Sequence, residues 1–474
     1  MMKYDVIVVG AGPAGIFFAY EMMQKNRTAK VLLIDRGEDI YHRRCPILEG
    51  KLDKCPKNPE GISGCYPACS ITSGFGGAGA YSDGKFNITA EFGGWLTEYL
   101  SKDEVYELIR YVDDINIKHG APRNLTDPST KAVKTIEKKG LAVGLKLLRA
   151  QVRHLGTEIN LNIMKSIYDE LSKHVDMMFK TEVVDVVITN ERVSGVLLKN
   201  ERVIEAPYVF VAAGRQGSKW MEEMFHRHQV RLYNNHVDIG VRVETNDVIM
   251  EEINEHLYEG KFIYNTSLGT HVRTFCSNPS GHVVVENHNG TMLANGHAFY
   301  DKQLGTENTN FALLVSHRFD EPFNQPNHYA YEIGGLANLL SNGSIIVQKY
   351  GDLVKGRRTT KKRLNENFVK PSLHEAVPGD LGLVMPYKTM QSIIEMIEAL
   401  DHVTPGIANE HTLLYGVETK FYSAKPEVDH YFETKVHGLY VGGDGAGMTR
   451  GLAQAGANGV WVARRISKLI GEES

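Results

Sequence analysis

Six residues near the N-terminus have the types and spacing of a turn that binds a pyrophosphate. The segment 10–15 reads GAGPAG and follows an apolar run, Tyr4–Val9, that predicts a buried parallel strand. Residues Ile16–Met23 then predict a helix whose N-terminus faces the phosphates. The first glycine permits the tight turn, the second lets the backbone reach the phosphates, and the third lets the helix pack closely. The expected dinucleotide-binding residues are Gly10, Gly12, Pro13, Ala14 and Gly15.

A second predicted strand, Val31–Ile34, ends in an acidic residue. Asp35 stands 20 residues after Gly15, the spacing of a carboxylate that accepts hydrogen bonds from an adenosine ribose. We expect Asp35 and its neighbour Arg36 to contact the cofactor. Strand, glycines, helix, strand and acid in this order favour a dinucleotide over an ordinary turn, but they do not distinguish NAD from FAD.

The C-terminal part of the chain carries a second glycine-rich turn. Residues 438–446 read GLYVGGDGA, and Leu452–Ile470 predicts a closing helix. This segment resembles the second FAD fingerprint of glutathione-reductase-type flavoproteins. The resemblance implies that Asp444 hydrogen-bonds the ribitol chain and that the helix N-terminus faces the flavin pyrimidine, where its dipole stabilises negative charge. The residues expected to bind FAD here are Gly443, Asp444, Gly451, Leu452 and Ala453.

The middle of the chain agrees with this family. Residues Thr181–Ile188, Arg192–Leu198 and Arg202–Ala206 alternate like a small antiparallel meander, and Tyr208–Ala213 predicts an apolar strand ending at Gly214. Flavoproteins of this type carry such a meander before a turn similar to Ala212–Gly214. The resemblance implies an adenine contact through the backbone at Val183 or Val184, and cofactor contacts at Ala213 and Gly214.

Another glycine-rich loop, residues 74–85, reads GFGGAGAYSDGK. It resembles the segment beside the isoalloxazine ring in a family of poorly characterised bacterial and archaeal FAD-dependent dehydrogenases. Further segments similar to that family are RTFC at 273–276, GDL at 351–353, PGDL at 378–381 and GVETK at 416–420. The chain departs from the family after Cys276, where it has SNPSG. The resemblance implies cofactor contacts at Gly76, Gly77, Ala78, Gly79 and Ser82.

Four of the five cysteines, Cys45, Cys55, Cys65 and Cys69, fall within one short segment before that loop. Four thiolates could hold an iron–sulfur cluster or a tetrahedral zinc ion. The spacing lacks the close pair with two intervening residues that most such sites carry. Reduced cysteines packed as small apolar side chains, and a redox-active thiol pair, are the alternatives. The fifth cysteine, Cys276, is expected in the core.

Flavin supplies hydride chemistry, so the protein must move a proton and hold the charge of the substrate. Asp83 and Lys85 lie in the loop expected beside the ring, and a solvent-facing turn is their alternative. Glu418 and Lys420 end an apolar strand, where an ordinary ion pair is equally consistent. The remaining catalytic candidates are Arg450, which precedes the closing helix, and His282, which lies in a predicted strand; a surface arginine and a strand histidine are the plainer interpretations.

Composition limits the partners. The net charge of −4 gives no electrostatic case for nucleic acid. No stretch is apolar enough to span a membrane or to serve as a secretory signal, so we expect a cytoplasmic protein without a membrane span. No second GxGxxG follows a strand. We therefore expect NAD(P)H only as a transient electron donor, or electrons from a donor protein or from a small-molecule substrate.

The expected fold class is α/β, with a discontinuous Rossmann-like FAD-binding domain of the glutathione-reductase type and a mixed α+β substrate or cap domain. The FAD domain is expected from 1–95, 145–235 and 406–474, with a cysteine-containing insertion at 37–73 and a helical insertion at 96–144. The cap domain is expected at 236–405. Helices are predicted at Lys102–His119, Leu141–His154, Glu158–His174 (capped by Thr157) and Met390–Leu400.

Two functions fit these features. The first is an FAD-dependent dehydrogenase or reductase that transfers hydride between flavin N5 and a small, perhaps anionic, metabolite. The second is an electron-transfer or accessory flavoprotein, in which the cysteines hold a cluster or zinc. The sequence specifies neither substrate, nor electron donor, nor oligomeric state.

Overall fold

The fold is seen in a computed structural model that describes residues 3–46, 49–52, 56–57, 59, 65–82, 84–257, 260–288, 290–298, 302–320 and 322–473. The chain divides into two compact units. Unit 1 contains residues 1–126, 150–233 and 423–474, and unit 2 contains residues 127–149 and 234–422.

Unit 1 is built on a five-stranded parallel sheet with the strand order β22-β10-β1-β2-β6. Its short strands come from all three chain segments of the unit, and four of the five are fully buried apolar runs, as parallel strands covered on both faces should be. The strands are β1 (Val6–Val9), β2 (Val31–Ile34), β6 (Asp176–Met178), β10 (Tyr208–Val211) and β22 (Leu439–Val441). The predicted strands around both glycine fingerprints are confirmed.

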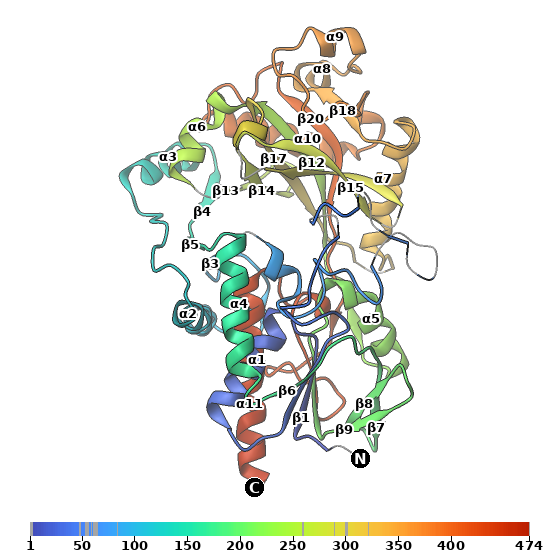
Figure 1. Ribbon diagram of the computed structural model, residues 1–474. Helices are drawn as coiled ribbons and strands as arrows, with labels where there is room; N and C mark the ends of the chain where they lie inside the picture. The colour runs from blue at the N-terminus through green and yellow to red at the C-terminus, as the bar shows by residue number, and fades with distance from the viewer. Residues whose placement is uncertain are drawn as a thin grey trace. The chain divides into compact units, whose positions relative to one another are not determined.

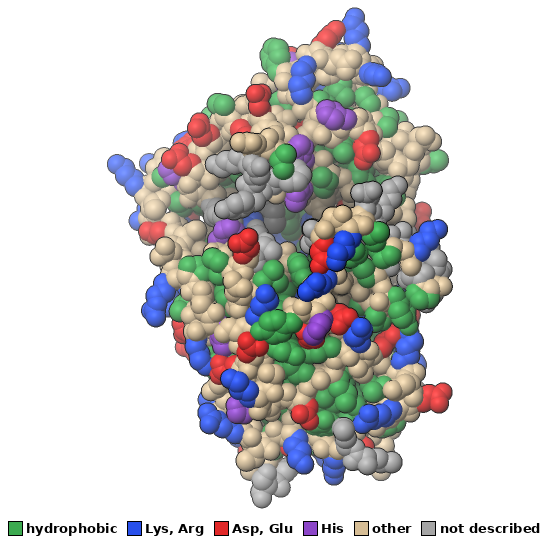
Figure 2. Space-filling view, viewed as in Figure 1, with side chains coloured by type: hydrophobic (Ala, Val, Ile, Leu, Met, Phe, Trp, Pro, Cys, Tyr) green, Lys and Arg blue, Asp and Glu red, His purple; other side chains and the backbone are tan. Residues whose placement is uncertain are grey.

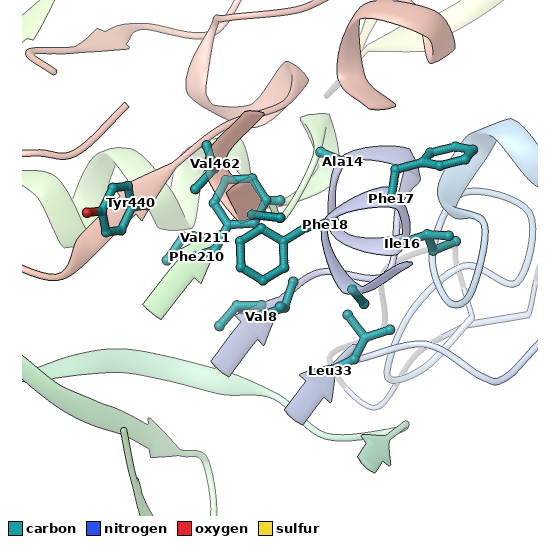
Figure 3. Packing of buried hydrophobic residues seen from close by; sticks show 14 of the residues in the cluster. Val8, Ala14, Ile16, Phe17, Phe18, Leu33, Phe210, Val211, Tyr440 and Val462 are labelled. Carbon is teal, nitrogen blue, oxygen red and sulfur yellow. The ribbon is translucent and has the colours of Figure 1, made fainter. Parts of the chain in front are cut away.

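Helices α1 (Pro13–Lys25) and α11 (Leu452–Glu473) pack against each other beside this sheet (Figure 1). Phe18 of α1 stacks on Phe210 of β10 with ring centroids 4.9 Å apart, in the centre of the core drawn in Figure 3. The two helices approach closely because Gly459 has no side chain: a Cβ there would lie 2.0 Å from the carbonyl oxygen of Ala14. The predicted closing helix is confirmed.

The predicted meander is confirmed as an antiparallel sheet of β7 (Val183–Thr189), β8 (Arg192–Leu198) and β9 (Val203–Glu205). The remaining helices of unit 1 include α2 (Lys102–Lys118), which Ser101 and Glu104 begin with a capping box. The other elements are α4 (Thr157–Leu171), α5 (Ser218–Arg227), and the strand pairs β3 (Lys85–Ile88) with β5 (Gln151–His154) and β11 (Leu232–Tyr233) with β21 (Lys425–Pro426).

Two local predictions are wrong. Residues 141–154 form two strands, β4 (Leu145–Leu148) and β5, instead of one helix. The chain passes from unit 2 to unit 1 between Arg149 and Ala150, and each strand is held by pairing within its own unit. The residue before α4 is Gly156, at φ 71°, and no side chain caps that helix, so Thr157 is not the N-cap.

Unit 2 is built on an eight-stranded sheet with the order β19-β18-β20-β12-β17-β14-β13-β4. All neighbours are antiparallel except β18 and β19. The strands are β12 (Val237–Asn246), β13 (Lys261–Asn265), β14 (His271–Asn278), β17 (Asn308–His317), β18 (Ile346–Lys349), β19 (Val377–Pro378), β20 (Leu413–Lys420) and β4; a separate hairpin joins β15 (His282–His288) to β16 (Thr291–His297). The helices are α3 (Lys131–Leu141), α6 (Asp247–His256), α7 (Pro326–Leu340), α8 (Tyr350–Val354), α9 (Lys361–Asn365) and α10 (Tyr387–Asp401).

The central strand β12 has two chemically different faces. Val237, Ile239, Val241 and Val243 belong to the main hydrophobic core of unit 2. The alternate residues include three charged side chains, all buried: Asp238, Arg242 and Glu244. This face of β12 therefore carries buried charges, which must be paired within the protein or with a ligand.

The unit boundaries differ from the expected ones at both crossover regions. Residues 406–422 belong to unit 2, because β20 hydrogen-bonds to β12 and β18. Residues 127–149 also belong to unit 2, because β4 pairs with β13. These pairings join segments far apart in the sequence, which local patterns do not reveal.

Among the described residues, no helix combines the length and hydropathy required to cross a membrane. Acidic and basic side chains are interspersed over the face shown in Figure 2, without one extended basic patch.

The contact between α1 and α11 leads to a stability prediction. Gly459→Ala should destabilise the protein by about 1–3 kcal/mol, because the new Cβ cannot fit against the backbone of Ala14. Gly471→Ala lies in the same helix with no atom within 4 Å of its Cβ position and should be neutral or stabilising by up to about 1 kcal/mol. Urea denaturation of both variants measures this difference; equal stabilities would contradict the packing described.

Candidate functional site

The N-terminal glycine turn combines two glycines that the fold requires with one that faces open space. A Cβ on Gly10 would lie 2.3 Å from the carbonyl oxygen of Ala212, and one on Gly15 would lie 1.9 Å from that of Gly10. Gly12 has nothing within 4 Å of its Cβ position. Gly12 is also the N-cap of α1, and no side chain caps this helix end. The helix N-terminus therefore offers backbone N–H groups beside an open space of the kind that a phosphate needs.

The second glycine loop lies against the first. The N–H of Gly76 donates to the carbonyl oxygen of Ala11 at 2.8 Å, and a Cβ on Gly77 would lie 3.1 Å from Cα of Gly12. A Cβ on Gly79 would lie 2.6 Å from Leu452, the first residue of α11. Three glycine-containing segments, 10–15, 74–79 and 443–452, thus converge in unit 1.

Asp35 ties these loops together. Its carboxylate accepts hydrogen bonds from the backbone N–H groups of Ala11 at 2.8 Å, Gly37 at 2.7 Å and Gly74 at 2.9 Å. The sequence predicts a ribose acceptor at this position, and two carboxylate oxygens have capacity for further donors. The next residue, Arg36, donates from Nη2 to the carbonyl oxygen of Gln216 at 3.3 Å.

The C-terminal turn is ordered by its own side chains. Asp444 accepts a hydrogen bond from Oγ1 of Thr449 at 2.7 Å and lies 3.9 Å from Nε of Arg215. The N–H of Gly443 donates to Oδ1 of Asn458 at 2.9 Å, which anchors the turn to α11. The backbone N–H of Arg450 donates to Gly93 at 2.9 Å.

Hydrogen bonds at the start of the meander distinguish the two candidates for the adenine contact, Val183 and Val184. The β7–β8 register shifts between Val183 and Asp185. The carbonyl oxygen of Val184 accepts hydrogen bonds from Nε1 of Trp220 at 2.9 Å and Nη2 of Arg227 at 3.2 Å. Because the Val184 carbonyl already has two donors, Val183 is the better candidate for the backbone contact with adenine.

Two residues that position the loop 74–82 were missed by sequence analysis. Nδ2 of Asn160 donates to the carbonyl oxygen of Gly79 at 2.6 Å. The buried Arg43 donates to three backbone carbonyls of residues 70–75 at 2.6–2.8 Å, and burial lowers the pKa of its guanidinium. Neither residue belongs to a recognisable motif; Asn160 stands 81 positions from Gly79.

Ser82 ends this loop, and its Oγ donates to the carbonyl oxygen of Gly79 at 2.7 Å. Lys85 begins β3 and is paired in register with His154 of β5. Asp83 lies outside the described residues. The catalytic roles of Lys85 and Asp83 stay predictions.

Cys45, Cys65 and Cys69 have intermediate exposure, and Cys55 lies outside the described residues. Within the described part of the chain, no three or more His, Cys, Asp or Glu side chains form a group that could hold a metal ion. The four-cysteine metal site stays a prediction.

In unit 2, Glu418 and Lys420 form an ion pair at 3.1 Å. Glu418 is fully buried and also lies 3.3 Å from Nη1 of Arg242, which is itself buried. The hairpin β15–β16 covers this arginine, since a Cβ on Gly296 would lie 2.0 Å from its Nη2. His282 begins β15, and its Nε2 lies 2.9 Å from the carbonyl oxygen of Leu304.

A second buried carboxylate, Asp238, lies on the same polar face of the sheet. Its Oδ2 accepts hydrogen bonds from Nη2 of Arg273 at 2.7 Å and the hydroxyl of Tyr422 at 2.5 Å. Its Oδ1 accepts from Oγ of Ser316 at 2.6 Å, and Nε2 of His236 lies 3.6 Å away. Burial opposes ionisation, but the charges of Arg273 and His236 and the two hydroxyl donors hold the pKa of Asp238 below its ordinary value. Sequence analysis missed this cluster because its members come from four separate segments.

The donor set of unit 1 fits FAD. Gly12 leaves the space that a pyrophosphate needs, α1 presents an uncapped N-terminus, and the loop 74–79 and the start of α11 lie against the same turn. The residues that would hold the cofactor all lie within one unit.

Comparisons with known proteins agree with this cofactor. Residues 236–421 match a family model described as "FAD-dependent protein, C-terminal domain-like". A protein of Clostridium beijerinckii, named only as uncharacterized, is 27% identical over 498 residues, covering 98% of this chain and 81% of the relative. The family match supports FAD as the cofactor, which makes the protein a flavoprotein.

Three solved structures that align with this chain have low sequence identity and TM-scores below 0.5. A quinol–fumarate reductase is 14% identical with a TM-score of 0.42, covering 100% of this chain and 72% of that chain. A glycine oxidase from Geobacillus kaustophilus is 11% identical with a TM-score of 0.37, covering 100% and 94%. An L-proline dehydrogenase from P. horikoshii is 10% identical with a TM-score of 0.36, again covering 100% and 94%.

Gly12→Val tests the phosphate position. The isopropyl group should fill the space beside the α1 N-terminus and weaken FAD binding at least about tenfold, while the apoprotein remains folded because no protein atom lies within 4 Å of the Cβ position. Flavin content after purification and the circular dichroism spectrum measure the two effects.

Gly335→Val is the matched control for this test, since Gly335 also has nothing within 4 Å of its Cβ position but lies in α7 of unit 2. It should retain full flavin content. Normal FAD binding by Gly12→Val would show that the phosphates do not lie at this turn.

Asp238→Asn tests the buried ion pair. Removing the carboxylate leaves Arg273 without its counterion and should destabilise unit 2 by about 3–5 kcal/mol at neutral pH. Since the pKa of Asp238 is lower in the folded state, its stabilisation is present above the ordinary value of 3.8 and lost as the pH falls through the folded-state pKa. The difference between wild type and variant should therefore shrink in that acidic range.

Denaturation curves at several pH values measure this trend. Glu137→Gln, which breaks the exposed ion pair with Arg149, is the control and should cost less than about 1 kcal/mol. A similarly small cost for Asp238→Asn would contradict the structural importance assigned to the buried pair.

Proposed function

We propose that the protein is an FAD-dependent oxidoreductase that acts on a small metabolite. The observation that carries this proposal is the convergence of segments 10–15, 74–79 and 443–452 around the uncapped N-terminus of α1. When bound, FAD supplies hydride transfer between its N5 position and a substrate carbon. The protein must then bind the cofactor, orient the substrate and move one proton.

Each part of the cofactor has an assigned partner in the proposal. Gly12 and the α1 N-terminus hold the pyrophosphate, and Asp35 holds the adenosine ribose. Val183 contacts adenine through its backbone. Asp444 holds the ribitol chain, and the N-terminus of α11 stabilises negative charge on the pyrimidine side of the reduced ring.

Lys85 is the first candidate for stabilising charge beside the ring, because it ends the glycine-rich segment 74–85. Asp83 is the candidate that moves the proton. Asn160 and Arg43 position this loop through its backbone carbonyls and need not touch the substrate. The alternative is an electron-transfer or accessory flavoprotein in which Cys45, Cys55, Cys65 and Cys69 hold a cluster or zinc.

An anaerobic absorbance spectrum tests the proposal directly. The purified protein should show bound flavin, and NADH, NADPH or photoreduction should bleach it; an added electron acceptor should restore the oxidised spectrum. Gly12→Val, prepared identically, is the matched control and should lack the signal. Iron and zinc assays on the same sample separate an ordinary reductase from a carrier with a cluster. A protein that binds no flavin would overturn the proposal.

A further inference from the structure

A compact group of basic side chains lies in unit 2, in the segment that connects α8 to α9. Residues 355–363 read KGRRTTKKR, with six basic residues and no acidic one. Without these six charges, the net charge of −4 would become −10, so the group is basic in an otherwise acidic chain. Figure 2 shows Lys and Arg side chains over α8 and α9. Like charges this close repel one another, so the fold must hold them in place.

A buried carboxylate fixes the conformation of this segment. Asp352 is 2% exposed and accepts hydrogen bonds from Nε of Arg357 at 2.7 Å and Oγ1 of Thr359 at 2.8 Å. It also accepts one from Nε of Arg363 at 3.1 Å. The backbone N–H of Arg357 donates to the carbonyl oxygen of Asp352 at 3.0 Å. The cations are therefore held on an ordered surface, which lowers the entropy that a partner's binding would cost.

The outward-facing cations of the segment are not neutralised by the fold. Within the described part of the chain, Lys361 and Lys362 are exposed and have no ion pair or hydrogen bond of their side chains. Arg358 is exposed and has one long hydrogen bond, 3.5 Å, to the carbonyl oxygen of Pro378. Arg357 is 50% exposed and binds Asp352 through Nε, which leaves the other edge of its guanidinium for an acceptor. Fixed cations of this kind attract an anionic partner.

Acidic side chains border the basic group and limit the class of partner. Glu366 is exposed and directly follows α9, and Glu410 lies 3.5 Å from Nζ of Lys355. A membrane or a long nucleic acid would bring its anionic charge against these carboxylates as well as against the cations. A single acidic peptide segment contacts the cations alone, and its carboxylates match the planar edge of an arginine.

Two apolar side chains are exposed beside the cations. Phe368, which lies shortly after α9, is 81% exposed, and its ring stacks on His411 with centroids 4.0 Å apart. His411 follows Glu410, the partner of Lys355. Val354 precedes Lys355 and is 52% exposed. An aromatic ring held next to a charged group offers a contact for an apolar side chain of the partner.

We propose that residues 354–368 form a docking surface for an acidic segment of another protein. Carboxylates of that segment pair with Arg357, Arg358, Lys361 and Lys362, and one apolar side chain contacts Phe368. This function goes beyond the proposed oxidoreductase activity and does not depend on it, since every residue of the surface lies in unit 2.

The test is a fluorescence-anisotropy titration of the FAD-loaded, full-length protein into a labelled acidic peptide. The peptide alternates glutamate with glycine and carries one central phenylalanine. It should bind, and more weakly as salt is added, because exposed charges are screened. A version with glutamine in place of glutamate should bind at least about tenfold more weakly. The triple variant Arg358→Gln, Lys361→Gln and Lys362→Gln should also weaken binding at least about tenfold.

The matched control is the triple variant Lys131→Gln, Lys134→Gln and Lys138→Gln. These three lysines are exposed on α3 of the same unit, so the control removes the same charge from another surface and should bind the peptide as the wild type does. The unfolding midpoint of each variant verifies that it is folded. Phe368→Ser should weaken binding about two- to tenfold, and only for the peptide that contains phenylalanine.

No binding of the acidic peptide by the wild type, or equal losses in the two triple variants, would overturn the docking surface. Vesicles of phosphatidylglycerol and a single-stranded oligonucleotide are titrated at the same salt concentration. Tighter binding of either one than of the peptide would overturn the acidic protein segment as the occupant. An unchanged affinity in Phe368→Ser would overturn the apolar contact.

Discussion

The close approach of α1 and α11 is the constraint on which unit 1 depends. Gly459 lets α11 lie directly on the backbone of Ala14, so the helices that follow the first and last glycine turns share one surface. Because the two helices begin at Pro13 and Leu452, their contact also brings both helix starts to the same group of loops. The proposed cofactor site, made from segments 10–15 and 443–452, depends on this contact.

Buried charge organises unit 2 in a different way. Asp238 and Glu418 are fully buried carboxylates, and each is paired with an arginine from another strand. Removing two such charges from water is expensive, and their mutual attraction offsets the cost only with good geometry and additional hydrogen bonds. The hydroxyls of Ser316 and Tyr422 supply those bonds at Asp238. These hydrogen bonds hold the buried polar groups of unit 2 in fixed positions.

Local sequence patterns predicted those secondary-structure elements that a single continuous segment forms. The apolar strands β1 and β2, the helix α11 and the meander follow from hydrophobic periodicity and turn residues, and the structure confirms them. The pattern failed at 141–154, where apolar residues at helix-like spacing lie in two strands of different units. Strand pairing over long sequence distances decides such a segment, and no local propensity encodes it.

The sequence by itself determined the cofactor class, because a glycine turn between strand and helix carries its chemistry in the backbone. It also identified Asp35 and the loop 74–85 as candidate parts of that site. Only the tertiary structure decided which glycines are required by packing and which, like Gly12, leave space for a ligand. It alone revealed Arg43, Asn160 and the Arg273–Asp238 pair, because each acts through partners distant in the chain. Side chains whose partners are distant in the chain have no characteristic spacing in the sequence, so the sequence does not reveal them.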